Sequence, residues 1–175
     1  MRRVMTSLLV AGCISSSALA FQARSGGAAA GKACALLPRD LVMKILPDPR
    51  KKELEREKPE DDPFAEDLKA AGRPVKPGMS CMFGPVMLDL DGLAKPAEVR
   101  EALRARTRPY EKFEPVAGVG DAAFFRSNSA WASMYVWTGS HHFTVELGRG
   151  PTGDDTQGLK PNVIELATGI VARLR

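Results

Sequence analysis

The sequence predicts an α+β domain in which an antiparallel β-sheet, arranged as a meander, is flanked by an N-terminal and a C-terminal helix and held by one disulfide. Three observations predict this fold. Short runs of alternating apolar and polar residues recur between residues 80 and 147, apolar stripes with helical spacing lie near both ends, and two cysteines remain beyond an N-terminal leader. A chain of 175 residues has room for one such domain, at residues 33–175.

Residues 1–20 have the features of a secretory signal peptide. Two arginines precede an apolar run, and the run ends in Ala18-Leu19-Ala20, a small-residue cleavage site. We therefore expect a periplasmic or secreted protein, with residues 21–32 as a disordered mature N-terminus. No apolar run reaches the roughly 20 residues needed to cross a bilayer, so no transmembrane segment is expected.

Cys13 offers a second outcome for the same leader. The residues around it, VAGC, resemble the box at which a lipoprotein is cleaved and acylated on its cysteine. Cleavage there would leave a leader shorter than the usual length of about 15 to 30 residues, so we expect release after Ala20. Under the alternative, residues 14–32 would be a flexible tether between a lipid anchor and the domain.

The charge of the chain is nearly balanced. Its 25 basic and 21 acidic residues give a formal charge of +4, which falls to +2 when Arg2 and Arg3 leave with the leader. The basic residues at 50–52 and 100–108 are interleaved with acids or spaced along a helix, and do not gather as a phosphate-binding cluster. Nucleic acid is therefore not an expected partner.

Cys34 and Cys81 are the two cysteines of the mature chain. Two cysteines in an oxidising compartment pair by default. A bridge between them closes a loop of 48 residues. In the chain-entropy model such a bridge stabilises the folded protein by about 4 kcal/mol. The alternatives are two free buried thiols, or a metal or redox pair, although the CxxC spacing and neighbouring histidine typical of such pairs are missing.

The first predicted helix runs from Cys34 to Leu46, where apolar residues form one stripe and Pro38 predicts a break near the first turn. The stretch 47–78 then combines several prolines with charges of both signs. We expect it to be a charged surface excursion that adds little to the core, with a short helix at 50–58.

Strand and helix patterns alternate through the rest of the chain. Residues 80–91 have strand character with a bend or a change of strand at Gly84-Pro85, and residues 95–108 form a helix whose basic side faces solvent. The remaining elements are predicted strands at 110–116, 121–126, 130–138 and 141–147, and a final helix opened by Pro161.

The pair Gly139-Ser140 sets the register of one hairpin, because a Gly-X pair suits a two-residue type II′ turn. Thr138 then faces His141, and the pairing continues to Ala132 opposite Leu147. Side chains alternate across strands, so one face is apolar core and the other combines large aromatics with polar groups. The second face holds Trp131, Ser133, Tyr135, Trp137, His142, Thr144 and Glu146.

This second face is the candidate binding face, and its site residues are Trp131, Tyr135, Trp137, His142 and Glu146. Large aromatics with polar tips are typical of binding surfaces. The alternative is that a helix covers the face and the two tryptophans form a second core layer. The exposure of the tryptophan rings distinguishes the two.

The sequence carries no catalytic, metal or cofactor motif. His141 and His142 are adjacent strand residues that point to opposite faces, so they cannot easily share an ion. The methionines near Cys81 are interpreted as core filling rather than as a copper(I) site. We therefore expect no cofactor and no enzymatic activity; the alternative is a periplasmic metal- or small-ligand-binding protein, or an enzyme that uses His142 and Glu146.

Five short motifs carry a resemblance to other proteins: ACALLPRDLVMKIL, SCMF, VAGVGDAAFF, FTVEL and LATGIVARL. Over most of residues 33–174 the chain resembles small bacterial exported proteins and lipoproteins of unknown function, whose domains look like the PsbP-like α/β sandwich. The resemblance implies a helix-to-strand disulfide from Cys34 to Cys81, and the long charged excursion departs from it. It implies no activity. We expect a non-catalytic binding or structural domain of the bacterial envelope, whose partner is an unidentified protein or small ligand.

Overall fold

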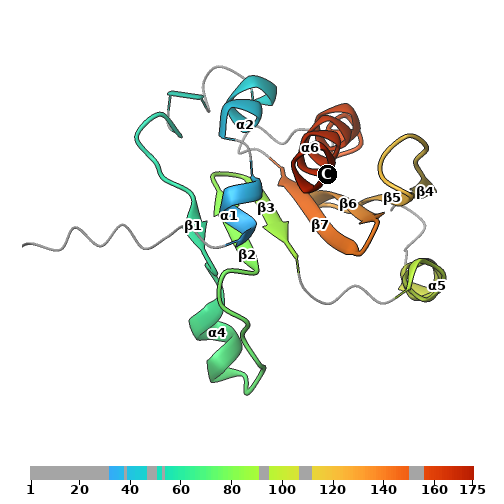
Figure 1. Ribbon diagram of the computed structural model, residues 1–175, viewed down its shortest axis with the longest axis horizontal. Helices are drawn as coiled ribbons and strands as arrows, with labels where there is room; N and C mark the ends of the chain where they lie inside the picture. The colour runs from blue at the N-terminus through green and yellow to red at the C-terminus, as the bar shows by residue number, and fades with distance from the viewer. Residues whose placement is uncertain are drawn as a thin grey trace, which may run out of the picture.

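An antiparallel sheet of seven strands forms the centre of the protein, and helices lie on both of its faces (Figure 1). The computed structural model describes residues 32–37, 39–46, 51–52, 54–90, 95–106, 112–149 and 156–175. The predicted fold class, an antiparallel sheet with flanking helices and one disulfide, is confirmed. The predicted leader, Cys13 and residues 21–31 lie outside the described residues.

The elements follow one another along the chain much as the sequence predicts. The helices are α1 (Lys32–Leu36), α2 (Arg39–Ile45), α4 (Ala65–Ala70), α5 (Pro96–Arg106) and α6 (Lys160–Leu174). The strands are β1 (Glu60–Asp61), β2 (Ser80–Phe83), β3 (Val86–Asp89), β4 (Lys112–Pro115), β5 (Ala122–Ser127), β6 (Trp131–Thr138) and β7 (His141–Gly148). The predicted first helix is two helices, α1 and α2, divided around Pro38, and the predicted strand 80–91 is a hairpin that turns at Gly84-Pro85.

The order of strands in the sheet is β1-β2-β3-β7-β6-β5-β4. Strands β4 to β7 form a consecutive antiparallel meander, as predicted. The β2–β3 hairpin is added at the far side of this meander, because β3 pairs with β7 and not with β4, the next strand in the chain. Helix α5 follows β3 in sequence and precedes β4, so the chain crosses from the middle of the sheet to its edge.

The β6–β7 hairpin has the predicted register. Thr138 pairs with His141, and the ladder continues to Ala132 opposite Leu147. Gly139 has a φ of +56°, the positive value that the first central position of a type II′ turn requires and that glycine adopts without steric cost. The predicted partition of side chains between the two faces of this hairpin therefore holds.

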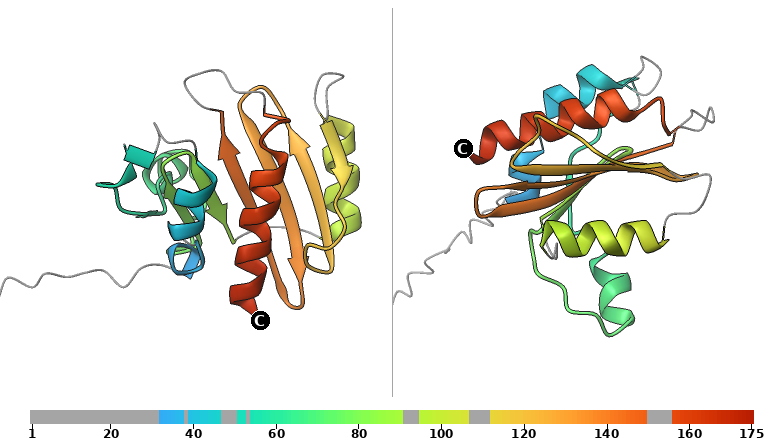
Figure 2. Two further views of the ribbon diagram at one scale, coloured as in Figure 1. Left: turned by 90° about the horizontal axis from the view of Figure 1, so that it is seen from above. Right: turned by 90° about the vertical axis from the view of Figure 1, so that its right-hand side faces the viewer.

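Helices α2 and α6 pack on one face of the sheet, whereas α5 lies on the opposite side (Figure 2). The apolar stripe of α6 is buried against the core face of the strands, as the helical spacing predicts. The largest fully buried side chains of this core include Phe83, Leu88, Phe125, Phe143, Leu166 and Ile170.

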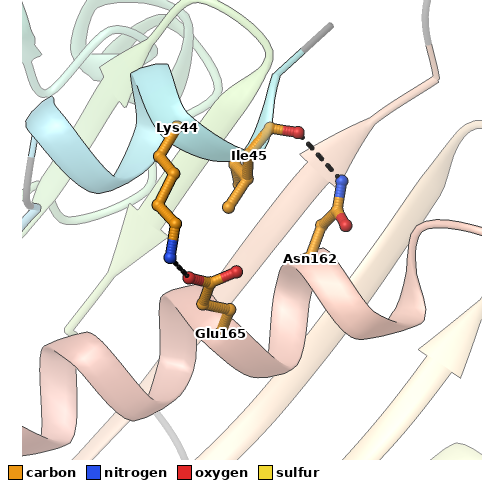
Figure 3. A network of polar contacts seen from close by, with 4 residues as sticks. All are labelled: Lys44, Ile45, Asn162 and Glu165. Atoms are coloured by element: carbon orange, nitrogen blue, oxygen red, sulfur yellow. Dashed lines mark hydrogen bonds and ion pairs between the residues drawn. The ribbon is translucent and has the colours of Figure 1, made fainter.

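Two polar contacts join α2 to α6 at the rim of the core (Figure 3). The Nδ2 of Asn162 donates to the carbonyl oxygen of Ile45 at 3.1 Å, which satisfies an acceptor at the end of α2. The Nζ of Lys44 lies 2.7 Å from Oε1 of Glu165. Both charged side chains are exposed, so the ion pair adds little stability and the contacts act mainly to orient the two helices.

Cys34 in α1 and Cys81 in β2 form a disulfide with a Cα–Cα distance of 5.0 Å. The predicted pairing is confirmed, and the interpretations as free thiols or as a metal or redox pair are wrong. The amide of Ala33 also donates to the carbonyl of Gly78 at 3.0 Å, just before β2. Together these bonds fix the short helix α1 against the sheet, where five residues alone would not form a stable helix.

The charged excursion 47–78 contributes more to the fold than its composition predicts. Leu54 is only 3% exposed and packs over Gly84, at the turn between β2 and β3. The short strand β1 extends the sheet by pairing with β2. Sequence reasoning missed both features, because one leucine and two acidic residues carry no periodic signal.

Asp62, with a φ of +49°, ties the excursion to the sheet. Its carboxylate accepts hydrogen bonds from the amides of Gly78 and Ser80 and from the Ser80 hydroxyl. Burial raises the pKa of Asp62, but these donors favour the charged form more strongly, and the pKa lies below its ordinary value. The loop 62–80 is therefore closed by a charge-assisted clamp.

Candidate functional site

The five predicted site residues, Trp131, Tyr135, Trp137, His142 and Glu146, lie on one face of the β6–β7 hairpin, opposite the core and α6. Their shared face follows from the register that Gly139-Ser140 sets. Their exposures differ, however, and divide the face into three parts: an aromatic layer, a buried polar network, and an edge that reaches solvent.

Trp137 belongs to the aromatic layer and is only 9% exposed. Its ring meets Phe124 edge-on at 5.8 Å between centroids, and Phe124 in turn stacks on Phe113 at 5.5 Å. Helix α5 lies on this side of the sheet (Figure 2), and its Leu103 is buried. Trp137 therefore contributes to a second apolar layer, as the alternative interpretation of the face expects.

Trp131 is partly exposed at the opposite end of β6. It pairs with Gly148, and the space above that glycine is filled by the indole, since a Cβ at Gly148 would lie 3.0 Å from the ring. Pro85, Ala130 and Arg149 complete a shallow depression around it. This half-buried ring is held by its neighbours and presents only its outer edge to a partner.

Ser133, Tyr135 and Glu146 form a buried polar network in the middle of the face. The Ser133 hydroxyl, 2% exposed as a residue, donates to Oε1 of Glu146 at 2.6 Å. Burial raises the pKa of Glu146; the Ser133 hydrogen bond and Arg126 oppose this, and nearby Asp89 adds to it. Burial and then Glu146 raise the pKa of Tyr135, against a hydrogen bond from Arg126.

His142 and Glu146 do not form a joint centre. They are four residues apart on one strand, which places their Cα atoms about 13 Å apart. Neither a metal ion nor a transferred proton can be shared over that distance. Across the described ranges, no three His, Cys, Asp or Glu residues are grouped so that they could hold a metal ion.

A hollow of about 530 Å³ lies at the N-terminal end of β7, where His142 is one of its lining residues. We call it the α1–α6 hollow, because both helices contribute to its wall. Its apolar lining consists of Ala35, Leu36, Met79, Leu90 and Leu174, and its polar lining of Lys32, Ser140, His141 and His142. The exposed residues Lys32, Ala35, Ser140 and His141 mark its rim.

The register between β3 and β7 places the beginning of β7 beside this hollow. Their pairing stops where Asp89 meets Thr144, so the first three residues of β7 extend past the described end of β3. Both histidines at that end of β7 line the hollow, although their side chains point to opposite faces, because the hollow opens at the strand edge. The disulfide, by fixing α1 against β2, supplies the opposite wall.

Sequence reasoning found His142 but missed the other lining residues of the α1–α6 hollow. The disulfide was the one signal that could have placed α1 near this edge of the sheet. The β3–β7 pairing joins strands far apart in the chain, and no turn sets its register.

No helix among the described residues is long and apolar enough to span a membrane. No protein-family model, curated protein or solved structure matches this chain. The resemblance to exported proteins with a PsbP-like domain therefore stays a prediction, as do the leader, its cleavage after Ala20 and the lipidation of Cys13.

Proposed function

We propose that this chain is an exported, non-catalytic binding domain of the bacterial envelope, periplasmic or secreted, that holds a small ligand or part of a protein in the α1–α6 hollow. The hollow itself carries the proposal. Its volume of about 530 Å³ lies inside the range of about 300 to 1,000 Å³ typical of small-molecule sites, and mostly apolar walls with a few polar groups are typical of them too.

Export is supported by the leader sequence and by the disulfide. The leader has a basic start, an apolar run and a small-residue cleavage site. The bond between Cys34 and Cys81 is of a kind that persists outside the cytoplasm. The same bond anchors one wall of the hollow, so an oxidising compartment favours both the fold and the site.

A binding role is favoured over an enzymatic one by the placement of the polar groups. Glu146 is largely buried and hydrogen-bonded to Ser133, whereas His142 faces the hollow. The two residues that could have acted together as acid and base are thus separated. The hollow offers hydrogen-bonding groups at its rim and apolar side chains beneath them, an arrangement that retains a ligand.

The proposal is tested by filling the hollow and measuring the binding of Nile red, a neutral dye whose fluorescence rises in apolar surroundings. Ala35→Trp places an indole at the rim, from an exposed position in α1. Ala70→Trp, at an exposed position in α4 away from the hollow, is the matched control. We expect the first variant to reduce Nile red binding at least tenfold and the second to leave it unchanged. Equal binding by both variants and the parent would overturn the proposal.

A further inference from the structure

Among the described residues that line the α1–α6 hollow, the polar side chains are basic or neutral. Lys32 lines it together with Ser140, His141 and His142, and none of the lining residues in the described part of the chain is acidic. Arg173 adds a further cation beside α1, where its Nη1 lies 3.4 Å from the carbonyl oxygen of Ala35. The wall therefore carries hydrogen-bond donors and positive charge, with no carboxylate from the residues that the structure describes.

The carboxylate of Asp121, beside the turn of the β6–β7 hairpin, already accepts a hydrogen bond. Asp121 accepts a 2.6 Å hydrogen bond from the amide of Gly139, which ties it to the tip of the β6–β7 hairpin. It does not line the hollow. The two rim cations, Lys32 and Arg173, are therefore placed to attract an anion from solution.

The floor of the hollow has a different character from its rim. Leu36, Met79, Leu90 and Leu174 are partly buried there and present aliphatic and thioether surface. Such side chains accommodate an alkyl chain, and methionine adapts readily to irregular apolar ligands. A ligand that matches both parts carries an anionic head at the rim and a hydrocarbon tail on the floor.

We infer that the occupant of the α1–α6 hollow is a free, single-chain amphipathic carboxylate of the fatty-acid class. Its tail lies among the leucines and Met79, and its head meets Lys32 and the two histidines. The inference rests on the proposed function and names the ligand class for the same hollow. One chain is assigned because about 530 Å³ lies in the lower half of the range for small-molecule sites.

Displacement of Nile red by three dodecyl compounds tests the head group. Dodecanoate, dodecanol and dodecylammonium have equal tails, and each is used below its micelle-forming concentration with the disulfide-bonded mature chain. We expect dodecanoate to bind about tenfold more tightly than dodecylammonium, because several exposed charge contacts each contribute a modest factor. Octanoate and decanoate test the tail, and each added methylene should tighten binding about fourfold until the floor is filled.

The matched pair Lys32→Gln and Lys112→Gln separates the rim charge from the net charge of the chain. Both lysines are exposed, and Lys112 lies on β4 at the edge of the sheet, away from the lining residues. We expect Lys32→Gln to weaken dodecanoate about three- to fivefold relative to dodecanol, which has the same tail without the charge. Lys112→Gln should change neither, and thermal unfolding of both variants verifies the fold.

The outcomes of these titrations are distinct. If dodecanoate, dodecanol and dodecylammonium bind with equal affinity while Ala35→Trp still prevents Nile red binding, the carboxylate assignment is overturned. The proposed function then stands. Failure of Nile red to bind the parent chain overturns the proposed function itself. Sedimentation with vesicles of anionic lipid, without binding of monomeric dodecanoate, would assign the rim cations to a membrane surface and overturn the free ligand.

Discussion

The hydroxyl of Ser133 donates a 2.6 Å hydrogen bond to the carboxylate of Glu146 across the β6–β7 hairpin, in the interior of the face opposite α6. The two residues are direct cross-strand partners, so the register set by Gly139-Ser140 brings them together. Glu146 therefore sits in a largely buried position where the Ser133 hydroxyl is one of the few groups that favour its charged form.

Replacing Ser133 by Ala should destabilise the protein by about 1 to 3 kcal/mol, because a buried carboxylate loses its hydrogen-bond donor. Glu146→Gln should cost much less, since the amide oxygen can still accept from the hydroxyl while the buried charge is removed. Urea unfolding of the parent and both variants near neutral pH measures the difference. A loss for Glu146→Gln as large as that for Ser133→Ala would show that the charge itself stabilises the fold.

The raised pKa of Glu146 makes stability depend on pH in a defined direction. Because burial raises this pKa above its ordinary value of 4.5, the folded chain holds the proton more tightly than the unfolded chain. The resulting stabilisation is present below about pH 4.5 and is lost as the pH rises through the raised pKa.

The difference in unfolding free energy between the parent and Glu146→Gln isolates this effect. The contribution of Asp62, whose lowered pKa stabilises the fold above its ordinary 3.8, is common to both proteins and cancels. We expect the parent to lose stability relative to the variant as the pH increases from about 4 to about 8. Parallel pH profiles would contradict the raised pKa.

Gly120 lies two residues before β5, and its conformation leaves no room for a side chain. Its φ is +61°, and an added Cβ would lie 2.3 Å from the carbonyl oxygen of Trp137. We expect Gly120→Ala to cost about 2 to 5 kcal/mol, through backbone strain and overpacking together. Gly118 is a matched control, since its φ of +81° is also positive but its Cβ would meet open space. Gly118→Ala should cost only about 1 to 2 kcal/mol in thermal or urea unfolding.

Local sequence signals predicted the parts of the fold that depend on neighbours in the chain. One Gly-X turn was enough to give the complete β6–β7 register, because the period of a strand is two and every later pair follows from the first. The pair of cysteines predicted the link between α1 and β2, because removal of the predicted leader would leave two thiols with one partner each. The apolar stripe of α6 likewise required no tertiary information.

The parts that depend on distant pairing could not be predicted in the same way. No turn links β3 to β7, so the position where their ladder ends at Asp89 and Thr144 is set by packing. Beyond that position the first three residues of β7 have no partner in the described part of β3, and His141 and His142 line the α1–α6 hollow there. The exposure of Trp137 was undetermined for the same reason, since it depends on which face α5 crosses.

The predicted leader determines which mass we expect for the protein purified from envelope fractions. We expect the intact mass of a chain that begins at Phe21, because cleavage after Ala20 gives a leader of ordinary length. The mass should also be lower by two hydrogens than that of the reduced chain, owing to the disulfide. A chain that begins at Cys13 and carries acyl groups would instead establish the lipid anchor. Mass spectrometry before and after reduction distinguishes these outcomes.

The disulfide should couple stability to ligand binding. Because the bond closes a long loop and fixes α1, replacing Cys34 and Cys81 together by Ala should destabilise the protein by about 4 kcal/mol in the chain-entropy model. The same variant should lose most of its Nile red binding at temperatures where circular dichroism shows the sheet to be folded, since Ala35 and Leu36 of α1 form one wall of the hollow. Glu165→Gln, which removes only the exposed ion pair between α2 and α6, should affect neither property measurably. Full dye binding by a folded protein without the disulfide would show that α1 holds its position through packing alone, and that the bond serves stability and not the site.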